Sequence, residues 1–349
     1  MNIKREELAV SDYESVVYGE DPKTGLKAIV AIHSTALGPA CGGIRMLPYA
    51  SREEALKDVL RLAKGMSYKS SLAGNGFGGG KSVIIGDPAK KTPELFHAFG
   101  EFVNSFDGRY LSAQDMNITS EDLKKVKKTT RHVIGIEGEP GSSGDPSPVT
   151  ARGVLRALEA TAEKINGAKS LDGIRIAIQG LGSVGYRLAE MAHEAGAELW
   201  VTDINPAVVE KAVEMLAAEP VEGDEIFEVE CDIFSPNAKG AVLNAETIGR
   251  LQCQAVCGAA NNQLATDADG FRLHERGILY APDYAANAGG IINIFVEFGG
   301  YSQAKAFEHT DRIYHTMREI FRRSDKEKIP PFVIADRIAE ERILAGRSK

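Results

Sequence analysis

The chain has 349 residues, 43% hydrophobic and 26% charged, and no apolar run approaches the roughly 20 residues that a membrane-spanning helix needs. This length exceeds the roughly 100 to 200 residues of an ordinary domain, so we expect two domains. The formal net charge of -8, a pI near 5.5 and the scatter of basic residues among acids argue against nucleic acid as a partner. The first segment, MNIKREELAV, is charged and lacks the apolar core of a signal peptide, so we expect a cytoplasmic protein with no membrane attachment.

The cysteines indicate neither disulfides nor a metal site. Four cysteines are too few for a disulfide framework, and the pair at positions 253 and 257 has no second Cys or His pair nearby to complete a zinc site. We therefore expect no metal and buried free thiols at Cys41, Cys231, Cys253 and Cys257.

The first half of the chain predicts strands and helices in turn. Residues 26–33, LKAIVAIH, place apolar side chains at every second position, which predicts a strand. Residues 51–69 predict a helix that begins with a capping box of Ser51 and Glu54. The core-facing side chains expected on this helix are Leu56, Val59, Leu60 and Ala63.

A glycine-rich stretch, GNGFGGGK, follows this helix and is expected to form a loop before a short buried strand, SVIIG. Thr92 and Pro93 predict the N-cap and first residue of another helix, and the segment RYLSA predicts the next strand. Between Gly138 and Pro148 nearly every residue is Gly, Pro or Ser, which is the composition of a linker. We place the domain boundary in this segment.

The second half predicts a parallel sheet with helices on both faces. A helix from about residue 149 is followed by five strand-like segments, IRIAIQG, ELWVTD, CDIFSP, QAVCGAA and GILYAPD, with helical stretches after the first two. Residues 301–323 and 333–344 predict further helices.

A glycine motif, GxGxxG, lies where the first strand of this second half meets a helix. Asp203 ends the next predicted strand 23 residues after Gly180, close to the roughly 20 expected of a dinucleotide-binding unit. In such a unit the first glycine permits the turn, the second admits the pyrophosphate and the third packs helix on strand, while the acidic residue binds the adenine ribose. The residues expected to bind the dinucleotide in this turn are Gly180, Gly182, Ser183, Val184 and Gly185.

The residues around Asp203 favour NAD. Its carboxylate would repel a 2'-phosphate, and the following INPAVVE contains no Arg or Lys to bind one. FAD ranks below NAD because this unit lies in the middle of the chain, and a tight turn that binds no nucleotide is the structural alternative.

A phosphate-loop interpretation of GFGGGKS does not hold. The motif GxxxxGK[ST] requires glycine where Asn75 stands, and it should lead into a helix, whereas KSVIIGDP predicts a strand. A nucleotide triphosphatase is therefore rejected.

The glycines around Lys81 instead indicate a lysine presented in a cleft, where burial lowers the pKa of an amine toward the range of a general base. Lys69 follows Leu62 and Met66 on one helical face and is expected to point toward the same side. Asp115 ends a predicted strand, from which a carboxylate can reach a cleft. For either lysine alone a solvated surface position is the common alternative, and for the aspartate a cap or turn.

Segments along nearly the whole chain resemble the Glu/Leu/Phe/Val dehydrogenase family, most closely its leucine dehydrogenases. They are LGPACGGIRM, LRLAKGMSYK, GGGKSVIIGDP, GRYLSAQD, GSSGDPSPVTARGV, VTDIN, GAANNQL and YAPDYAANAGGIIN, in the order of the family. The resemblance implies NAD-dependent, reversible oxidative deamination of an L-amino acid to a 2-oxo acid and ammonia.

The resemblance also implies site roles. Lys69 would bind the substrate carboxylate with help from Asn262, Lys81 would be the general base that activates water, and Asp115 would handle protons at the amino group. Gly42 is expected at the substrate, and Ala238 is expected to bind the cofactor. The residues expected at the nicotinamide and its ribose are Thr150, Asn261 and Asn287.

The chain departs from the family pattern in two places. Asn75 and Phe77 stand where relatives have aliphatic residues, which affects the shape of the lysine loop. Asn237 and Lys239 stand where relatives often have cysteine and leucine near the cofactor, which could change cofactor affinity.

The substrate pocket is expected to be apolar. Glutamate-specific relatives hold the distal carboxylate with a lysine and a serine, and the matching positions here are Cys41 and Ile294. Ala113 and Ile291 complete the apolar wall, and a desolvated, unpaired carboxylate would cost several kcal/mol. Leucine, valine and isoleucine fit this pocket, and phenylalanine and tryptophan remain open because Cys41 is small.

The expected architecture is α/β with two domains. Residues 1–135 with about 331–349 form a substrate-binding and oligomerisation domain, residues 136–330 form a doubly wound Rossmann domain, and the catalytic cleft lies between them. The resemblance implies a homo-oligomer, with an octamer as one candidate. The rival from another class is a catalytically silent NAD-binding protein on the same fold.

Overall fold

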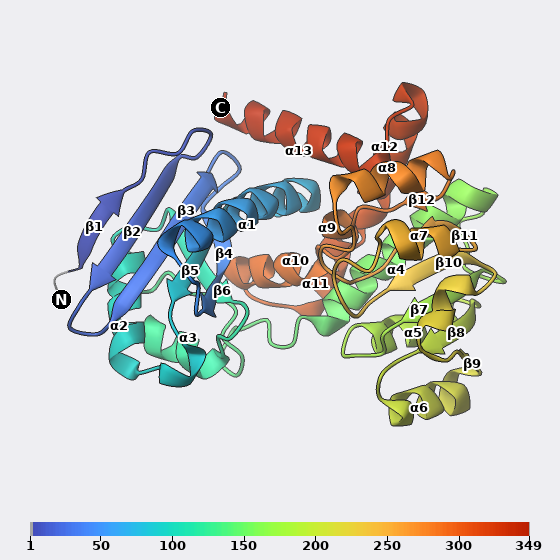
Figure 1. The fold of residues 1–349 in the computed structure, drawn as a ribbon, viewed down its shortest axis with the longest axis horizontal. Coiled ribbons are helices and arrows are strands. Elements are labelled where there is room, and N and C mark those ends of the chain that lie inside the picture. Colours follow the sequence, from blue (N-terminus) through green and yellow to red (C-terminus); the bar gives the residue numbers. More distant parts are fainter. Residues whose placement is uncertain (1–2, 349) are drawn as a thin grey trace. The chain divides into compact units, whose positions relative to one another are not determined.

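The structure is a computed structural model that describes residues 3–348, and it divides into two compact α/β units (Figure 1). Unit 1 comprises Met1–Gly144, Ile294–Ser302 and Ala339–Lys349, and unit 2 comprises Asp145–Asn293 and Gln303–Ile338. The division falls inside the predicted linker, after Gly144 rather than after residue 135. Residues 294–302 belong to unit 1 because Glu297 accepts hydrogen bonds from the backbone N–H groups of Gly135 and Ser143 at 3.2 and 2.7 Å.

The sheet of unit 1 has six strands in the order β1-β2-β3-β5-β4-β6. Neighbours from β1 to β5 are antiparallel, whereas β4 runs parallel to both β5 and β6. The strands are β1 (Lys4–Glu7), β2 (Ser15–Asp21), β3 (Leu26–Ser34), β4 (Ala40–Leu47), β5 (Gly78–Ile85) and β6 (Tyr110–Gln114). The strands predicted at residues 26–33 and at RYLSA are confirmed as β3 and β6.

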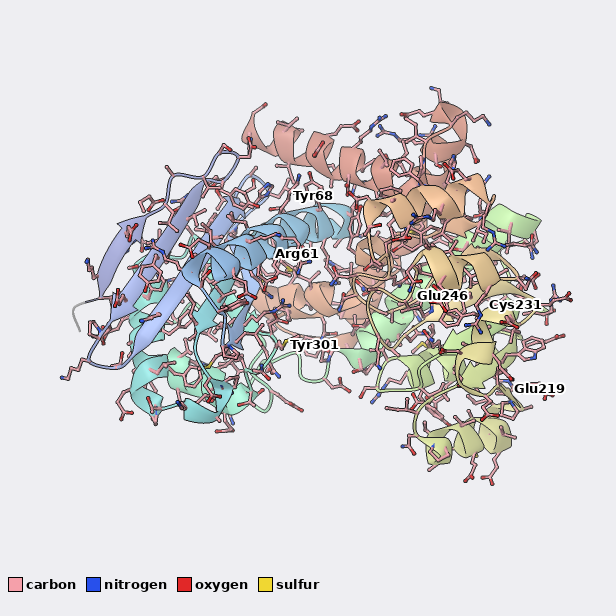
Figure 2. All side chains as sticks on the ribbon, viewed as in Figure 1. Arg61, Tyr68, Glu219, Cys231, Glu246 and Tyr301 are labelled. Carbon is pink, nitrogen blue, oxygen red and sulfur yellow. The ribbon has the colours of Figure 1, made fainter. Side chains whose placement is uncertain are left out.

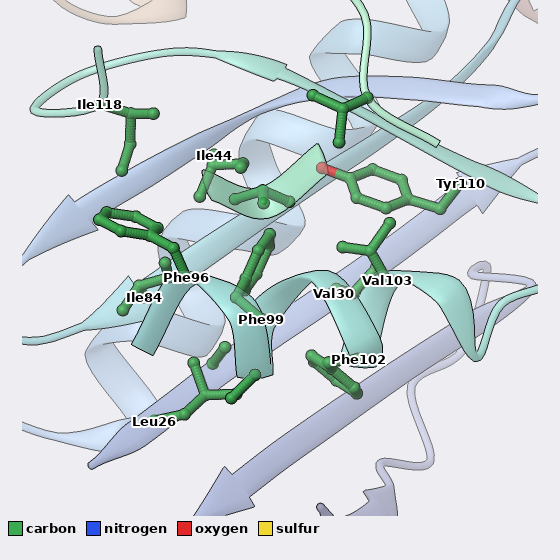
Figure 3. Close-up of a cluster of buried hydrophobic side chains, with 14 of the residues drawn as sticks. Leu26, Val30, Ile44, Ile84, Phe96, Phe99, Phe102, Val103, Tyr110 and Ile118 are labelled. Carbon is green, nitrogen blue, oxygen red and sulfur yellow. The ribbon is translucent and has the colours of Figure 1, made fainter. Parts of the chain in front are cut away.

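Helices cover both faces of this sheet. Side chains of α2 (Pro93–Asn104) and α3 (Ser120–Lys127) pack on one face, where Phe96, Phe99 and Phe102 lie against strand residues such as Val30 (Figure 3). Thr92 caps α2 by accepting the Leu95 N–H, as predicted. The short 3-10 helix η1 (Pro88–Lys90) precedes α2.

Helix α1 (Arg52–Ala73) packs on the opposite face. Val59 and Ala63 are buried as predicted, but Leu56 and Leu60 are only half-buried. The predicted capping box is half present. The Ser51 hydroxyl accepts the N–H of Glu54 at 3.2 Å, whereas the Glu54 carboxylate receives the N–H of Ala50 rather than that of Ser51.

The glycine-rich stretch before Lys81 is a strand rather than a loop. Gly78, Gly79 and Gly80 begin β5, and the structure shows why they lack side chains. A Cβ atom on Gly79 would lie 2.0 Å from the backbone nitrogen of Ser67 in α1, and one on Gly78 would lie 2.1 Å from the carbonyl oxygen of Ser34. The glycines therefore allow α1 and the neighbouring loop to approach the strand closely.

Unit 2 contains the predicted parallel sheet, with strand order β12-β11-β10-β7-β8-β9. The chain starts at the central strand β7, proceeds outward to β9, and returns to β10 beside β7. Because crossovers between parallel strands are right-handed, this reversal puts the crossover helices on both faces and makes a switch point between β7 and β10. The strands are β7 (Arg175–Gln179), β8 (Glu198–Thr202), β9 (Glu219–Pro220), β10 (Cys231–Pro236), β11 (Cys253–Val256) and β12 (Leu279–Tyr280).

The segment predicted as helical at residues 301–323 forms two helices, α11 and α12, and α12 packs on α4. The crossover elements are α5 (Gly185–Glu194), α6 (Pro206–Leu216), η2 (Gly223–Glu228), α7 (Ala245–Arg250) and α8 (Asp267–Glu275). The others are α4 (Ser147–Asn166), α9 (Asp283–Ala286), α10 (Gly289–Val296), η3 (Glu297–Gly299), α11 (Gln303–Thr310), α12 (Arg312–Glu327) and α13 (Pro331–Arg347).

All four cysteines are free, and Cys41, Cys231 and Cys257 are buried, but Cys253 is only half-buried. Within residues 3–348 no helix is long and apolar enough to cross a membrane. The same residues contain no cluster of three or more His, Cys, Asp or Glu side chains that could hold a metal ion.

Candidate active site

The centre of the candidate site in unit 1 is an ion pair between Lys81 and Asp115. Lys81 is the fourth residue of β5, and Asp115 directly follows β6. Their Nζ and Oδ2 atoms lie 2.6 Å apart, and the two side chains are 7% and 27% exposed. The sequence patterns indicated Lys81 and Asp115 separately, and in the structure their side chains form one ion pair.

The strand register explains this meeting. β4 lies between β5 and β6, with Cys41 paired to Gly79 and Gly43 paired to Ala113. Because side chains alternate along strands, Cys41, Lys81 and Ala113 share the face on which α1 packs. The candidate general base therefore has a small thiol and a methyl group on the same face of the sheet.

Two glycines of β4 permit the close packing around the pair. A Cβ atom on Gly43 would lie 2.6 Å from the Asp115 Cβ, and one on Gly42 would lie 1.9 Å from the carbonyl oxygen of Gly80. The Tyr110 hydroxyl donates to the Gly42 carbonyl at 2.9 Å and fixes the strand from the other face. Any larger residue at either glycine would displace the backbone that carries the ion pair.

Burial and charge act in opposite directions on the pair. Burial lowers the pKa of Lys81 below the usual range of an amine, although the nearby Asp115 carboxylate opposes this shift. For Asp115, burial would raise the pKa, but attraction to Lys81 and then to Arg45 outweighs it and lowers the pKa overall. The site thus contains a stable carboxylate beside an amine that loses its proton more readily than a surface lysine.

Arg45 and Asp58 are functional candidates that sequence analysis missed. Arg45 lies on β4 and donates from Nε to Asp115 Oδ2 at 3.0 Å and from NH1 to Asp58 Oδ2 at 3.1 Å. The sequence did contain a signal, because Arg45 stands two and four residues beyond Gly43 and Cys41 and therefore on the same strand face. Its partners depend on α1 and β6, which the sequence does not place.

The other substrate candidates in unit 1 are Lys69, Ile294 and Cys41. Lys69 is half-buried on α1, as are Leu62 and Met66 on the same helical side. Ile294 is half-buried, and a Cβ atom on Gly135 would lie 3.4 Å from its Cδ1. Cys41 is buried, and burial raises the pKa of its thiol to about 12, so the thiol stays uncharged and is not a nucleophile.

The lysine-loop departures form a packed structure. Asn75 is buried and its Oδ1 accepts the N–H of Phe77 at 3.0 Å. The Phe77 ring is also buried and packs edge-on against Phe295 and Phe298, with centroids 5.2 and 5.6 Å away. Phe77 is therefore occupied within the protein core of unit 1.

In unit 2 the three glycines of the GxGxxG turn have three different environments. Gly180 has φ +97°, and a Cβ atom on it would lie 2.7 Å from that of Ala238. A Cβ atom on Gly185 would lie 2.0 Å from the carbonyl oxygen of Gly180, whereas one on Gly182 would meet no heavy atom within 4 Å. The turn therefore needs the first glycine for its backbone conformation and the third for packing, and the second leaves open space where a pyrophosphate fits.

The carboxylate of Asp203 directly follows β8 and holds the loops around this turn. Its oxygens accept the backbone N–H groups of Leu181 and Asn205 at 2.6 and 2.8 Å. Ser183 is exposed, and its carbonyl accepts from Arg187 at 2.8 Å, while Val184 is half-buried at the start of α5. These residues fit a dinucleotide with its ribose at the carboxylate.

A second group of candidate residues gathers around the loop after β11. Asn287 is buried, and its Nδ2 donates to Asn261 Oδ1 at 2.9 Å and to the Ala259 carbonyl at 3.0 Å. Asn262 has φ +53°, and its N–H donates to Asp283 at 2.6 Å.

Elsewhere in unit 2, the Thr150 hydroxyl donates to the Pro146 carbonyl at 3.0 Å, and Ile291 is buried. Asn237, one of the departures, accepts the N–H of Ala259 at 2.8 Å and donates to the Ser235 carbonyl at 2.8 Å. It therefore ties together the loops after β10 and β11.

Unit 2 thus has the strand order, the glycine turn and the acidic residue of a dinucleotide-binding domain, and unit 1 contains a buried lysine and carboxylate suited to proton transfer. Together they define a two-domain dinucleotide-dependent oxidoreductase. Comparisons with known proteins identify the family.

Residues 14–132 match the model of the Glu/Leu/Phe/Val dehydrogenase dimerisation domain, and residues 141–212 and 201–329 match that of the glutamate/leucine/phenylalanine/valine dehydrogenases. The chain is 49% identical to a leucine dehydrogenase of Thermoactinomyces intermedius over 95% of this chain and 91% of the relative. It is 47% identical to a phenylalanine dehydrogenase of Caldalkalibacillus thermarum over 96% and 92% of the two chains. The crystal structure of an L-tryptophan dehydrogenase from Nostoc punctiforme superposes with a TM-score of 0.90 at 41% identity, covering 97% of each chain.

The chain therefore belongs to the Glu/Leu/Phe/Val dehydrogenase family of amino-acid dehydrogenases, as the sequence resemblance indicated.

Proposed function

We propose that this protein catalyses the reversible, NAD-dependent oxidative deamination of an apolar L-amino acid to its 2-oxo acid and ammonia, with leucine and other branched-chain amino acids preferred. The observation that carries the proposal is the ion pair of the buried Lys81 with the half-buried Asp115, on a sheet face that it shares with Cys41 and Ala113. It combines a proton-transfer site with an apolar neighbourhood. Similarity to phenylalanine and tryptophan dehydrogenases keeps an aromatic substrate as the second candidate.

Each residue of unit 1 has a distinct proposed role. Lys69 binds the substrate carboxylate through its ammonium group, assisted by Asn262 of unit 2. Lys81, with its lowered pKa, takes a proton from the water that attacks the imino carbon of the oxidised substrate. Asp115 accepts and returns protons at the substrate nitrogen, so that the carbinolamine collapses to the 2-oxo acid and ammonia.

The chemistry that the bound cofactor would supply is acceptance of the hydride from the substrate Cα. NAD is proposed over NADP because the Asp203 carboxylate would lie at the 2' position of the adenine ribose, where a phosphate would be repelled. The proposed dinucleotide contacts are Gly180, Gly182, Ser183, Val184, Gly185, Asp203, Thr150, Ala238, Asn261 and Asn287.

The proposed specificity follows from the absence of a partner charge at two positions. Cys41 and Ile294 stand where glutamate-specific relatives provide a lysine and a serine, and neither side chain can pair with a second carboxylate. Gly42, Ala113 and Ile291 are the other proposed substrate contacts. Since residues 14–132 match a dimerisation domain, we also propose that the protein is a homo-oligomer, with an octamer as one candidate.

The test of this function uses Lys81→Ala in a leucine and NAD assay read by NADH absorbance. We expect turnover to fall by at least roughly a hundredfold, the low end for a general base, because the variant lacks the amine that lies 2.6 Å from Asp115. NADH binding, measured by fluorescence titration, should stay near that of the wild type because Lys81 belongs to unit 1.

The matched control is Lys57→Ala, which removes an exposed lysine from α1 and should retain wild-type turnover. If Lys81→Ala keeps most of its turnover, the general base is another residue. If the wild type oxidises no amino acid while it binds NADH, the silent dinucleotide-binding protein is the correct alternative.

A further inference from the structure

The Lys81–Asp115 pair continues into a row of alternating charges that the proposed mechanism does not use. Asp115 contacts Arg45, Arg45 contacts Asp58, and Asp58 Oδ1 contacts the guanidinium of Arg61 at 3.0 Å. The Tyr49 hydroxyl also donates to Asp58 Oδ2 at 2.8 Å. The row therefore begins at the candidate base and ends at Arg61, which is 58% exposed and labelled on α1 in Figure 2.

The interior of this row is sheltered from solvent. The side chains of Arg45 and Asp58 are only 16% and 18% exposed, so their charges are weakly screened by water. Arg45 donates through Nε to one carboxylate and through NH1 to another, and this fork fixes both carboxylates relative to β4. Asp115 Oδ2 therefore receives two cations, Lys81 Nζ at 2.6 Å and Arg45 Nε at 3.0 Å.

We propose that Arg45 and Asp58 are a pair of positioning residues that hold the Asp115 carboxylate against Lys81 and set the charge around the base from behind the substrate site. Arg45 places a positive charge near Lys81, and Asp58 compensates part of it from α1. This inference rests on the proposed function, since it assigns Lys81 the role of base. Neither residue needs to touch the substrate for this role.

The effect of each residue on the base has a definite sign. The positive charge of Arg45 lowers the pKa of Lys81, whereas the negative charge of Asp58 raises it. Removing Arg45 should therefore raise the pKa of Lys81, and removing Asp58 should lower it. If Arg45 and Asp58 only stabilised the local structure, removing either one would disturb the same site. The two variants would then not shift the pKa of Lys81 in opposite directions.

Charged and titratable groups reach this region from every element packed around it, and they must be held constant in a test. From β4 and the loop after it they are Cys41, Arg45 and Tyr49, and from α1 they are Asp58 and Arg61. From β6 and its end they are Tyr110 and Asp115, and from η3 Glu297 acts on Cys41. Burial raises the pKa values of Cys41 and Tyr110, so both stay neutral at pH values where an ordinary thiol or phenol would lose its proton. The Cys41 thiol and the Tyr110 hydroxyl therefore do not titrate together with Lys81, whose pKa is lowered.

The experiment compares Arg45→Met with Asp58→Asn by two measurements. The first is the pH dependence of kcat/KM for leucine, whose rising limb reports the free base. We expect this limb to move to higher pH in Arg45→Met, by about one unit, and to lower pH in Asp58→Asn by less, because Arg45 acts on Lys81 more strongly than Asp58 does. The second is the pH dependence of trace acetylation of Lys81 with acetic anhydride, read by peptide mass spectrometry, which requires no turnover.

Two further variants separate charge from shape. Arg45→Lys keeps the positive charge without the fork and should keep the wild-type pH limb with a lower kcat. Arg61→Gln removes the exposed end of the row, which touches Asp58 but not Asp115, and should leave pH limb and kcat near the wild type. Thermal unfolding of each variant checks that the fold persists.

Opposite shifts in both measurements support the proposal, and shifts of the same sign or none overturn it. If Arg45→Met fails to fold, Asp58→Asn decides: a shift to lower pH supports the proposal, and no shift or a shift to higher pH overturns it. The acetylation profiles keep the inference separate from the proposed function. A wild type that oxidises no amino acid would reject that function, while opposite acetylation shifts would still support the positioning pair.

Discussion

Asp203 illustrates how one carboxylate serves both the fold and the proposed cofactor choice. It accepts backbone N–H groups from Leu181 in the glycine turn and from Asn205 at the start of α6, so it fixes two loops at the carboxyl end of the sheet. The same negative charge would face a 2'-phosphate. The role of Asp203 in the fold can be separated from its role in cofactor choice, because only the choice between NAD and NADP depends on a full negative charge.

We therefore predict that Asp203→Asn relaxes cofactor discrimination while the fold persists. The amide keeps the size of the carboxylate and one acceptor oxygen, so one backbone hydrogen bond survives. The ratio of kcat/KM for NAD to that for NADP should be high in the wild type and should fall by at least roughly tenfold in the variant, about 1.4 kcal/mol. Steady-state kinetics with both cofactors measures this ratio.

Asp224→Asn, which neutralises an exposed carboxylate in η2, is the control and should leave the ratio unchanged. A wild type that uses both cofactors with equal efficiency would show that Asp203 does not select between them.

Residue patterns predicted some members of the site and missed others for a physical reason. Lys81 and Asp115 could be chosen because each has a local signal, a glycine-rich approach and a strand end. Arg45 and Asp58 have their significance only through β4 lying between β5 and β6 with α1 packed on that face. A strand pattern does not state which strands are neighbours, so these contacts could not be predicted.

In the turn from β7 to α5, each of the three glycines meets a different structural requirement. Gly185 is closely packed against the Gly180 carbonyl, whereas nothing surrounds the place of a Cβ atom on Gly182. The same substitution should therefore have different consequences at the two positions. One position serves the fold of the turn and the other serves its ligand.

We predict that Gly182→Ala preserves stability but weakens dinucleotide binding, because its methyl group would occupy the space through which the pyrophosphate approaches. Its Kd for NADH should rise by at least roughly tenfold, about 1.4 kcal/mol, with little change in Tm. Gly185→Ala should instead lower stability by about 1 to 3 kcal/mol, the usual cost of overpacking, because its Cβ would lie 2.0 Å from the Gly180 oxygen.

Fluorescence titration and thermal unfolding of both variants make this comparison. The assignment of the turn would be wrong if Gly182→Ala bound NADH as the wild type does, or if the two variants lost stability equally.

The start of β5 shows where local propensity misleads. Gly78, Gly79 and Gly80 are poor strand formers, and their run predicted a loop. In the fold these glycines pair with β3 and β4. Glycine is needed at positions 78 and 79 because Ser34 and Ser67 leave no room for a side chain there. Tertiary packing overrides propensity here, whereas at β3, with regular apolar alternation, propensity and packing agree and the prediction is confirmed.

At the scale of the whole molecule, the doubly wound sheet of unit 2 could be predicted because strand and helix signals alternate and crossover handedness restricts the topology. The linker composition located the segment in which the contacts divide the chain. The membership of residues 294–302 in unit 1 could not be predicted. It depends on Glu297 binding Gly135 and Ser143, residues more than 150 positions away in the sequence.

The proposed apolar pocket determines which amino acids the protein oxidises. An apolar pocket without a partner for a second carboxylate should discriminate strongly against glutamate, because a desolvated unpaired charge costs several kcal/mol. Among apolar substrates the discrimination should be weaker, since one methylene contributes only about 1 to 3 kcal/mol. Branched aliphatic amino acids are therefore expected first and aromatic ones behind them.

The most direct measurement is a panel of the twenty L-amino acids with NAD at alkaline pH, followed by NADH absorbance and compared by kcat/KM. The account predicts that leucine and other branched aliphatic amino acids give the highest values, with glutamate lower by at least about a thousandfold, or ~4 kcal/mol. A leading phenylalanine or tryptophan would keep the reaction and contradict the substrate preference. A leading glutamate would show that the proposed apolar pocket with Cys41 and Ile294 is wrong.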